Sequence, residues 1–385
     1  MANHIVDTAI IGGGPAGICC AIALQKSGVT NLVVEKKKFP REKTCGGLVT
    51  EKTVQLLIET LDLSGPDELQ PIFCDASDTL ELYHGAEKLT SSIISKPFRF
   101  VKRADFDSFL ADQYRQRGGK LLESVCCKEF DLQNHRLLLS NGDTVQFRHL
   151  VVADGALSET GKRLGYRAPK LGFCVETHLS KEKLPALRGT RIVFGVVPKG
   201  YAWIFPSGKD VCVGLGGVYQ KKTKYDRLLD QFLSSLGVDP QTCRKKGAFV
   251  PYGTPVRQTR GDGDMILIGD AGGFVDPIYG EGLYFAVATG MEAANAILEN
   301  PEKIRSAFLK RTAPLAKTIR QGNRLQNFFF KAAVQTLFRK VVPGKNAFVG
   351  FYCDNQVSQY RYSYANLWKL CKDYKRKKRT APPTD

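Results

Sequence analysis

The 385-residue sequence predicts an α/β fold in which a parallel-sheet domain is interrupted by a β-rich domain and followed by a helical C-terminal region. Three observations lead to this prediction. The chain is longer than the roughly 250–300 residues at which a single core stops growing. Residues 5–35 have the pattern of a strand, a glycine-rich turn, a helix and a second strand. The order of apolar strand, glycine-rich loop and helix returns near residue 265, so the first domain is expected to be discontinuous.

The N-terminal pattern is a βαβ unit. Val6–Ile11 is a short apolar run and Ile18–Lys26 has helical composition, which Gly28 ends. Leu32–Val34 is a second apolar strand, closed by Glu35. These elements span about 30 residues, the length of a dinucleotide-binding module.

The turn of this unit is the GxGxxG sequence Gly12–Gly17. Gly12 permits a tight turn, Gly14 lets the backbone approach a pyrophosphate, and Gly17 lets the helix pack close to the strand. The helix N-terminus then presents partial positive charge to the phosphates. Glu35 should accept hydrogen bonds from ribose hydroxyls and disfavours a 2′-phosphate, so NAD or FAD is favoured over NADP. The predicted nucleotide contacts at this end are Gly12, Gly14, Pro15, Ala16, Gly17, Glu35 and Lys36.

A second strand–loop–helix segment begins at Met265 and favours FAD. Asp270 follows the apolar strand and can accept hydrogen bonds from ribityl hydroxyls. The loop leads into a helix predicted for Gly282–Leu298, whose N-terminus can stabilise negative charge at flavin N1 and O2. The predicted contacts here are Gly269, Asp270, Gly280, Glu281, Gly282 and Leu283.

The middle of the chain supplies the remaining elements. A helix is predicted over residues 105–118, and alternating or apolar runs predict a β-rich region over residues 171–218. Shorter strands are predicted at 121–130, 136–139, 144–147 and 150–153, with a hairpin turn at 141–143. The expected domains are residues 1–75, 100–168 and 258–325 for FAD, residues 76–99 and 169–257 for substrate, and residues 326–385 for C-terminal helices and a basic tail.

Three further segments carry a family resemblance. Val151–Ala156 contains an Asp154-Gly155 pair, residues 39–48 read Phe-Pro-Arg-Glu-Lys-Thr-Cys-Gly-Gly-Leu, and residues 201–206 read Tyr-Ala-Trp-Ile-Phe-Pro. With the two glycine-rich segments, the chain resembles the para-hydroxybenzoate hydroxylase-type flavoproteins and, within them, the geranylgeranyl reductase family. The likeness covers residues 5–300. It implies a Rossmann-like FAD-binding domain, an inserted β-rich substrate domain and a helical C-terminal region.

The resemblance also implies residue roles. Arg103, together with Arg41, matches arginines that hold the FAD phosphates or ribityl region, and Asp154 and Gly155 match a cofactor motif. Cys45, with Gly46 and Gly47, would lie near the isoalloxazine ring in the substrate pocket. The implied substrate contacts are Tyr201, Trp203, Phe205 and Pro206, and the candidate catalytic residues are Cys45, Tyr201 and Trp203. Because three aromatics at alternate positions share one face, they can line an apolar tunnel or simply form a core strand.

The predicted function is an FAD-dependent reductase that saturates C=C bonds of a long apolar, isoprenoid substrate by hydride transfer from reduced flavin N5. The alternatives are an FAD-dependent monooxygenase or halogenase and a quinone-linked electron-transfer flavoprotein at a membrane surface. Gly273, Tyr201 and Phe205 depart from the hydroxylase and halogenase motifs. The electron donor, NAD(P)H or reduced ferredoxin, stays open, as does the proton donor, for which an ordered water and Cys45 are candidates.

Composition limits the partners. The net charge of +18 implies an anionic partner such as an anionic membrane surface or a small acidic redox protein, and residues 369–379 hold seven Lys or Arg against one Asp. The helix predicted for residues 325–342 packs on the protein or lies in a membrane interface. Nucleic acid is not expected, because the basic run lacks a base-stacking platform. No metal is expected: the 11 cysteines include no CxxC pair. The five histidines are expected at the surface or in the core, and the location is expected to be cytoplasmic or peripheral on the inner face of the cell membrane.

Overall fold

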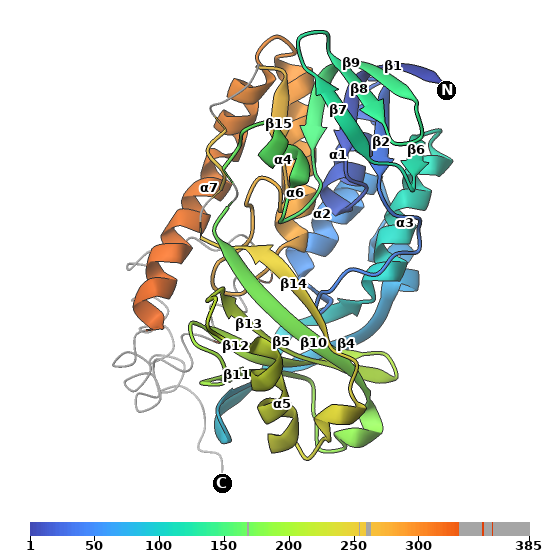
Figure 1. Ribbon diagram of the computed structural model, residues 1–385. Coiled ribbons are helices and arrows are strands. Elements are labelled where there is room, and N and C mark those ends of the chain that lie inside the picture. The colour runs from blue at the N-terminus through green and yellow to red at the C-terminus, as the bar shows by residue number, and fades with distance from the viewer. Residues whose placement is uncertain (168, 254, 259–262, 331–348, 350–355, 357–385) are drawn as a thin grey trace.

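The computed structural model describes residues 1–385 except 168, 254, 259–262, 331–348, 350–355 and 357–385. Two sheets are arranged one above the other (Figure 1), and helices cover the upper one. The upper sheet has the strand order β6-β2-β1-β9-β8-β7, with β15 also paired to β9. Its strands are β1 (Asn3–Ile11), β2 (Asn31–Glu35), β6 (Lys120–Glu123), β7 (Cys127–Asp131), β8 (Arg136–Leu139), β9 (Thr144–Val152) and β15 (Met265–Leu267).

The centre of the upper sheet is parallel. Ile10 of β1 lies opposite Val33 of β2 on one side and Val151 of β9 on the other, and all three side chains are buried. Continuous apolar strands of this kind form where both faces of a sheet are covered. The carboxyl ends of β1, β2, β9 and β15 therefore meet at one edge, where ligands bind in open α/β sheets.

Helices fill the spaces around this sheet. The helix α1 packs closely on α6 at Gly290. A Cβ on that residue would lie 2.4 Å from the carbonyl oxygen of Ala16. Only a glycine in α6 allows this approach. The helices are α1 (Pro15–Lys26), α2 (Glu51–Leu61), α3 (Arg103–Gln116), α4 (Glu159–Arg163), α5 (Tyr225–Ser235), α6 (Leu283–Glu299) and α7 (Ile304–Phe329), with short 3₁₀ turns η1 (Pro66–Ile72), η2 (Lys181–Lys183) and η3 (Pro240–Thr242).

The lower sheet has the order β14-β10-β13-β12-β11-β4-β5-β3. One face packs against α5 around Val175, Val213 and Leu229. The opposite face carries Phe100, Trp203 and other apolar side chains. Its strands are β3 (Leu48–Val49), β4 (Phe73–His84), β5 (Glu87–Val101), β10 (Leu171–Ser180), β11 (Thr190–Phe194), β12 (Gly200–Ser207), β13 (Asp210–Val218) and β14 (Lys246–Pro251).

The α/β class is confirmed, and β15 joins the upper sheet after the strands of the lower one, but three predicted strands have wrong bounds. The single strand expected at 121–130 is two strands, because Ser124 has φ +58° and the chain leaves the sheet there. The resulting β6 and β7 lie at opposite edges. The two strands expected at 144–147 and 150–153 are the single strand β9, since Arg148 and His149 continue its register and ladder. The turn at 141–143 joins β8 to β9, with Gly142 at φ +88°.

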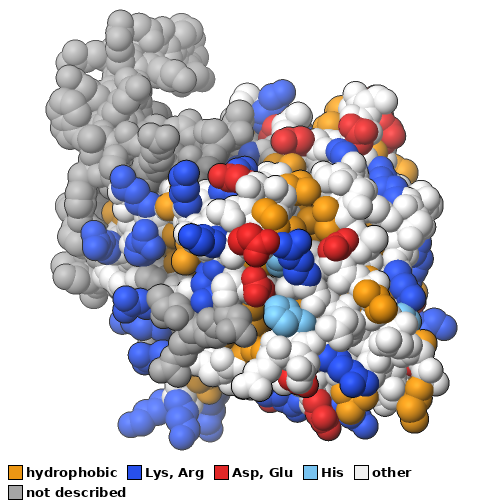
Figure 2. All heavy atoms as spheres, turned by 90° about the horizontal axis from the view of Figure 1, so that it is seen from above, with side chains coloured by type: hydrophobic (Ala, Val, Ile, Leu, Met, Phe, Trp, Pro, Cys, Tyr) orange, Lys and Arg blue, Asp and Glu red, His pale blue; other side chains and the backbone are white. Residues whose placement is uncertain are grey.

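The C-terminal predictions lie mostly outside the described residues. Of the helix predicted for residues 325–342, residues 325–329 belong to α7, and the basic run 369–379 is not described. No helix in the described part of the chain is both long enough and apolar enough to span a membrane. Lys and Arg side chains gather on the side that α7 occupies in Figure 1, as the view from above shows (Figure 2). On α7 itself Lys310, Lys317, Arg320 and Arg324 are exposed.

Candidate functional site

The glycine-rich turn has the geometry that its sequence predicts. Gly12 has φ +109°, and a Cβ there would lie 2.3 Å from the carbonyl oxygen of Ala153. A Cβ on Gly17 would lie 2.0 Å from the carbonyl oxygen of Gly12. Gly14 is the N-cap of α1, and a Cβ built there would meet, within the described part of the chain and apart from its sequence neighbours, just the Arg41 Nη2 atom at 3.7 Å. The first turn of α1 thus faces a space that is lined by backbone N–H groups and by the guanidinium group of Arg41.

Two backbone hydrogen bonds hold the Glu35 side chain beside this turn. Its side chain is buried, and its Oε2 accepts from the Gly13 N–H at 2.9 Å while Oε1 accepts from the Lys37 N–H at 2.9 Å. Each carboxylate oxygen can accept a second hydrogen bond. The neighbouring Lys36 is exposed. Glu35 is therefore held next to the N-terminus of α1, and its role as an acceptor for ribose hydroxyls stays a prediction.

Two arginines share one buried carboxylate. Arg103 forms a two-pronged pair with Asp107, at 2.8 and 2.9 Å, and Arg41 Nη1 lies 3.0 Å from the same carboxylate. Arg41 Nη2 also lies 3.6 Å from Glu35. Burial opposes the charge on Arg103, but the Asp107 carboxylate outweighs it and raises the pKa of Arg103 further. Asp107 was missed from sequence, because the predicted helix began at residue 105, whereas α3 begins at Arg103 and so places Asp107 at i+4 from it.

Two buried polar atoms at the cofactor end of the site lack hydrogen-bond partners within the described part of the chain. They are Arg41 Nε and Asp154 Oδ1. The other oxygen of Asp154 accepts from the Thr160 N–H at 3.0 Å, which holds the carboxylate at the end of β9. Buried polar atoms rarely stay unpaired, so a ligand with acceptors near Arg41 and hydroxyls near Asp154 fits these residues. A dinucleotide offers both groups.

The second glycine-rich loop brings the cofactor segments against the lower sheet. A Cβ on Gly269 would lie 2.9 Å from the Ala16 Cβ, and one on Gly282 would lie 3.6 Å from Asp270 Oδ1. Gly280 has φ +67° and lies beside Tyr201, whose hydroxyl donates to the Tyr279 carbonyl. Asp270 therefore lies at the N-terminus of α6, where Leu283 is the first helical residue.

Glu281 has an ionic partner. It is paired with Lys52 at 2.7 Å, and both side chains are buried. The Thr50 hydroxyl also donates to Glu281 Oε1, at 2.6 Å. These contacts fasten the loop before α6 to the start of α2. The predicted cofactor role of Glu281 stays a prediction.

The Cys45 loop lies directly on the aromatic face of β12. A Cβ on Gly46 would lie 2.9 Å from the Phe205 ring and 3.2 Å from Trp203 Nε1. The rings of Tyr201 and Trp203 are 6.2 Å apart, and those of Trp203 and Phe205 are 6.1 Å apart. Trp203 and Phe205 are each only 7% exposed. The aromatics share one face, as predicted, and this face meets the loop that carries Cys45, while Pro206 continues the strand opposite Val211.

Glu176 ties this loop to the lower sheet. Its Oε1 accepts from the Cys45 N–H at 2.8 Å, and the residue is 4% exposed. Burial raises the pKa of the Glu176 carboxyl, with the Cys45 N–H acting in the other direction. Sequence reasoning missed Glu176. A single acid in the middle of the apolar segment 171–179 was the available signal.

Comparison with known proteins identifies the family of this chain. The sequence model of pyridine nucleotide-disulphide oxidoreductases matches residues 6–193, and that of the geranylgeranyl reductase catalytic domain matches residues 174–249. An uncharacterized protein of Methanosarcina barkeri is 30% identical over 312 residues, which cover 80% of this chain and 77% of that protein. The chain belongs to the geranylgeranyl reductase family of FAD-dependent oxidoreductases. FAD is therefore the cofactor of this protein.

Two further relatives have named activities. The chain is 28% identical to the menaquinone reductase of Mycobacterium tuberculosis and 26% identical to the digeranylgeranylglycerophospholipid reductase of Methanocaldococcus jannaschii, with 76% of each chain covered in both cases. Among solved structures, a geranylgeranyl bacteriochlorophyll reductase-like protein of Thermoplasma acidophilum has a TM-score of 0.75 at 18% identity, covering 96% of both chains. The flavin-dependent brominase Bmp2 has a TM-score of 0.71 at 20% identity, covering 97% of this chain and all of that one. These two structures share the fold.

Proposed function

We propose that this protein saturates C=C bonds in a long apolar isoprenoid chain. The observation that carries the proposal is the packing of the Cys45 loop on the aromatic face of Tyr201, Trp203 and Phe205, where the cofactor segments meet the lower sheet. An apolar wall at that place suits a prenyl chain and excludes bulk water from the reacting centre. The names of the reductase relatives support the same substrate class.

The geometry of the site supports the following cofactor contacts. When bound, reduced FAD supplies a hydride from its N5 atom. The N–H groups at the start of α1 and the guanidiniums of Arg41 and Arg103 bind the pyrophosphate, and Asp107 holds both guanidiniums in place. Glu35 accepts from the adenosine ribose, and Asp154 and Asp270 accept from hydroxyls of the ribityl side.

The substrate contacts come from the lower sheet and the Cys45 loop. Trp203 and Phe205 orient the prenyl chain, while the hydroxyl of Tyr201 fastens the aromatic face to the loop at Tyr279. Cys45 is only partly buried, so its thiol can reach the space between loop and cofactor. The electrons come from NAD(P)H or reduced ferredoxin.

A quinone-linked role is the second candidate, because one relative is a menaquinone reductase. In that case the aromatic face binds the quinone and the flavin exchanges electrons with its ring. Rapid reduction of quinones with their prenyl tails left unchanged would identify this activity. The monooxygenase or halogenase alternative has support from the shared fold alone.

We keep the proposed domain boundaries, with residues 76–99 and 169–257 forming the substrate domain. The lower sheet extends beyond them, because β4 begins at Phe73, β5 ends at Val101 and β3 (Leu48–Val49) pairs with β5. We also include an anionic membrane surface among the proposed partners. The exposed cations of α7 support it, since Lys310, Lys317, Arg320 and Arg324 lie on the outer side of one long helix.

The test is mass spectrometry of lipids and quinones extracted from a host with and without the expressed protein, after bound FAD has been confirmed by its absorbance. We expect prenyl lipids that have gained two hydrogens per reduced bond. A matched host that expresses the Trp203→Ala variant should lack them. Products that have gained an oxygen atom would instead identify a monooxygenase and overturn the proposal.

A further inference from the structure

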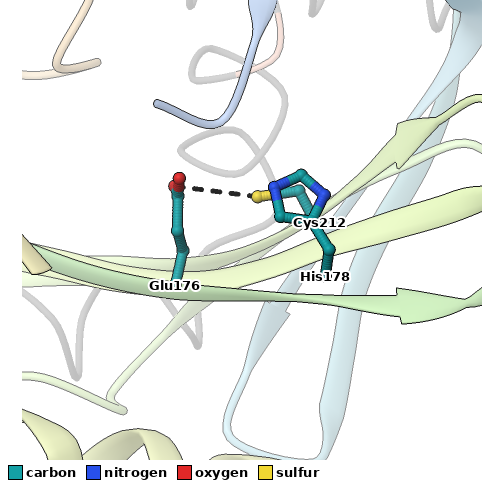
Figure 3. A group of neighbouring side chains, drawn as sticks. All are labelled: Glu176, His178 and Cys212. Carbon is teal, nitrogen blue, oxygen red and sulfur yellow. Dashed lines mark hydrogen bonds between the residues drawn. The ribbon is translucent and has the colours of Figure 1, made fainter. Parts of the chain in front are cut away.

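Three titratable side chains gather on neighbouring strands of the lower sheet (Figure 3). Glu176 and His178 lie two residues apart on β10 and therefore share a face, and Cys212 lies on the neighbouring strand directly opposite His178. Their carboxylate, imidazole and thiol atoms all lie within 4.8 Å of one another. None of the three belongs to a motif that the sequence analysis assigned to the cofactor or substrate.

The inner end of this group touches the candidate site. Glu176 accepts from the Cys45 N–H at 2.8 Å, and Cys212 Sγ lies 3.7 Å from the other carboxyl oxygen. Trp203 lies across the same place, because a Cβ on Gly214 would be 2.4 Å from its ring and 2.8 Å from the Glu176 Cβ. The Glu176 carboxyl is thus enclosed by the loop, the indole and a buried thiol.

The outer end of the group reaches solvent. His178 is exposed, whereas Glu176 is 4% exposed. The charged groups that act on His178 are Asp210, Lys102, Lys246 and Glu42, and those that act on Glu176 are Lys43 and Lys246. His178 is therefore the group through which a proton from water can enter and pass to the enclosed carboxyl.

The side-chain atoms of Glu176, His178 and Cys212 are poorly suited to binding a metal ion. Burial raises the pKa of the Cys212 thiol well above its usual value, which keeps it protonated. A metal ligand must be a thiolate. One Glu176 oxygen already accepts the Cys45 N–H. Proton transfer suits the group better than metal binding.

We propose that His178 and Glu176 form a proton-entry path that leads from solvent to the Cys45 loop and serves the alkene reduction. The inference rests on the proposed function. When bound, reduced FAD would supply the hydride for one alkene carbon, and the Cys45 thiol would give its proton to the other, so that the C=C double bond becomes a single bond with two new C–H bonds. Glu176, whose Oε1 lies 2.8 Å from the Cys45 backbone nitrogen, supplies the replacement proton at this loop, and His178 replaces the Glu176 proton from water.

The first test does not depend on turnover. Infrared spectra of the purified FAD-loaded protein should show the carbonyl stretch of a protonated carboxyl group at neutral pH. The band should be absent in Glu176→Gln and retained in Glu81→Gln, a buried acid of the same sheet that is paired with Arg191 and Lys88. A spectrum of Glu176→Gln identical to that of the unaltered protein would overturn the path.

The second test follows reoxidation of chemically reduced enzyme by a prenyl lipid, without oxygen. Glu176→Gln should slow it by about 100-fold, the lower range for removal of a general acid, with FAD content unchanged. His178→Ala should also slow it, and added imidazole should restore that variant but not Glu176→Gln, because only His178 is exposed. Glu81→Gln should react normally. Unaltered rates in both path variants, or no rescue by imidazole, would overturn the path.

The two proposals can fail separately. If none of the prenyl lipids reoxidises the unaltered reduced enzyme, the proposed function fails. The infrared band still reports on the Glu176 carboxyl in that case. If the unaltered enzyme reduces the lipid and Glu176→Gln reduces it as fast, the function stands and the path fails. A stoichiometric metal in the purified protein that is lost in His178→Ala would also overturn the path.

Discussion

Replacement of Asp107 by Asn tests the arginine pair that we assign to the FAD phosphates. The carboxylate makes three contacts, at 2.8 and 2.9 Å with Arg103 and at 3.0 Å with Arg41, and its side chain is fully buried. An amide keeps the shape but removes the charge and one acceptor. Two buried guanidiniums then lose their common counter-ion, and breaking a buried ion pair costs about 3–5 kcal/mol.

The matched control is Asp112→Asn on the same helix. Asp112 is exposed and pairs with Arg115 at 2.8 Å, so its loss should cost about 0.5 kcal/mol or less. We would measure urea unfolding of the FAD-free proteins by circular dichroism and the FAD bound per chain by absorbance. Asp107→Asn should unfold at much lower urea and bind far less FAD. The assignment is refuted if the two variants agree within about 1 kcal/mol and bind FAD equally.

Three further predictions concern the turn, the aromatic face and the buried acid. Gly17→Ala should abolish the absorbance of bound FAD, because its Cβ would lie 2.0 Å from the Gly12 carbonyl oxygen. The control Gly65→Ala should retain it, since a Cβ there meets nothing within 4 Å. Equal FAD content in the two variants would contradict the turn geometry. Gly214→Ala should displace the Trp203 ring and lower the free energy of unfolding by about 1–3 kcal/mol. Lipid reduction should be slower at normal FAD content. Lipid reduction at the normal rate would show that the position of the ring is unimportant. Because burial raises the pKa of Glu176 in the folded protein, its contribution to stability is present in acid and lost as pH rises through that pKa. The urea midpoint of the unaltered protein should therefore fall more steeply with pH than that of Glu176→Gln, and parallel curves would refute a raised pKa.

The cofactor half of the molecule was predictable because its constraints are local. The turn at Gly12–Gly17 needs particular glycines within one strand–turn–helix unit, and Glu35 ends the very next strand. Such requirements leave a pattern in neighbouring residues, so the βαβ unit and the Asp270 loop could be located from sequence. The same holds for the alternation of Tyr201, Trp203 and Phe205, which places them on one face of any strand.

The errors in strand prediction have a local cause with a long-range consequence. Residues 121–130 are continuously strand-like, and nothing in their composition reveals that Ser124 adopts a positive φ. Once the chain leaves the sheet there, β6 pairs with β2 and β7 pairs with β8. Pairing partners are set by the rest of the sheet, which sequence patterns do not report.

By itself the sequence determined the fold class, the FAD segments and the residues able to form an aromatic face. Only the tertiary structure decided what those residues meet. It joined Arg41 and Arg103 through Asp107, set Gly46 against Trp203, and placed Glu176 under the Cys45 backbone, 131 positions away along the chain. Contacts of this kind depend on how two sheets pack, and burial then changes the chemistry of the groups they enclose. The raised pKa of Glu176 is such a change, since it arises from removal of water by residues remote in sequence.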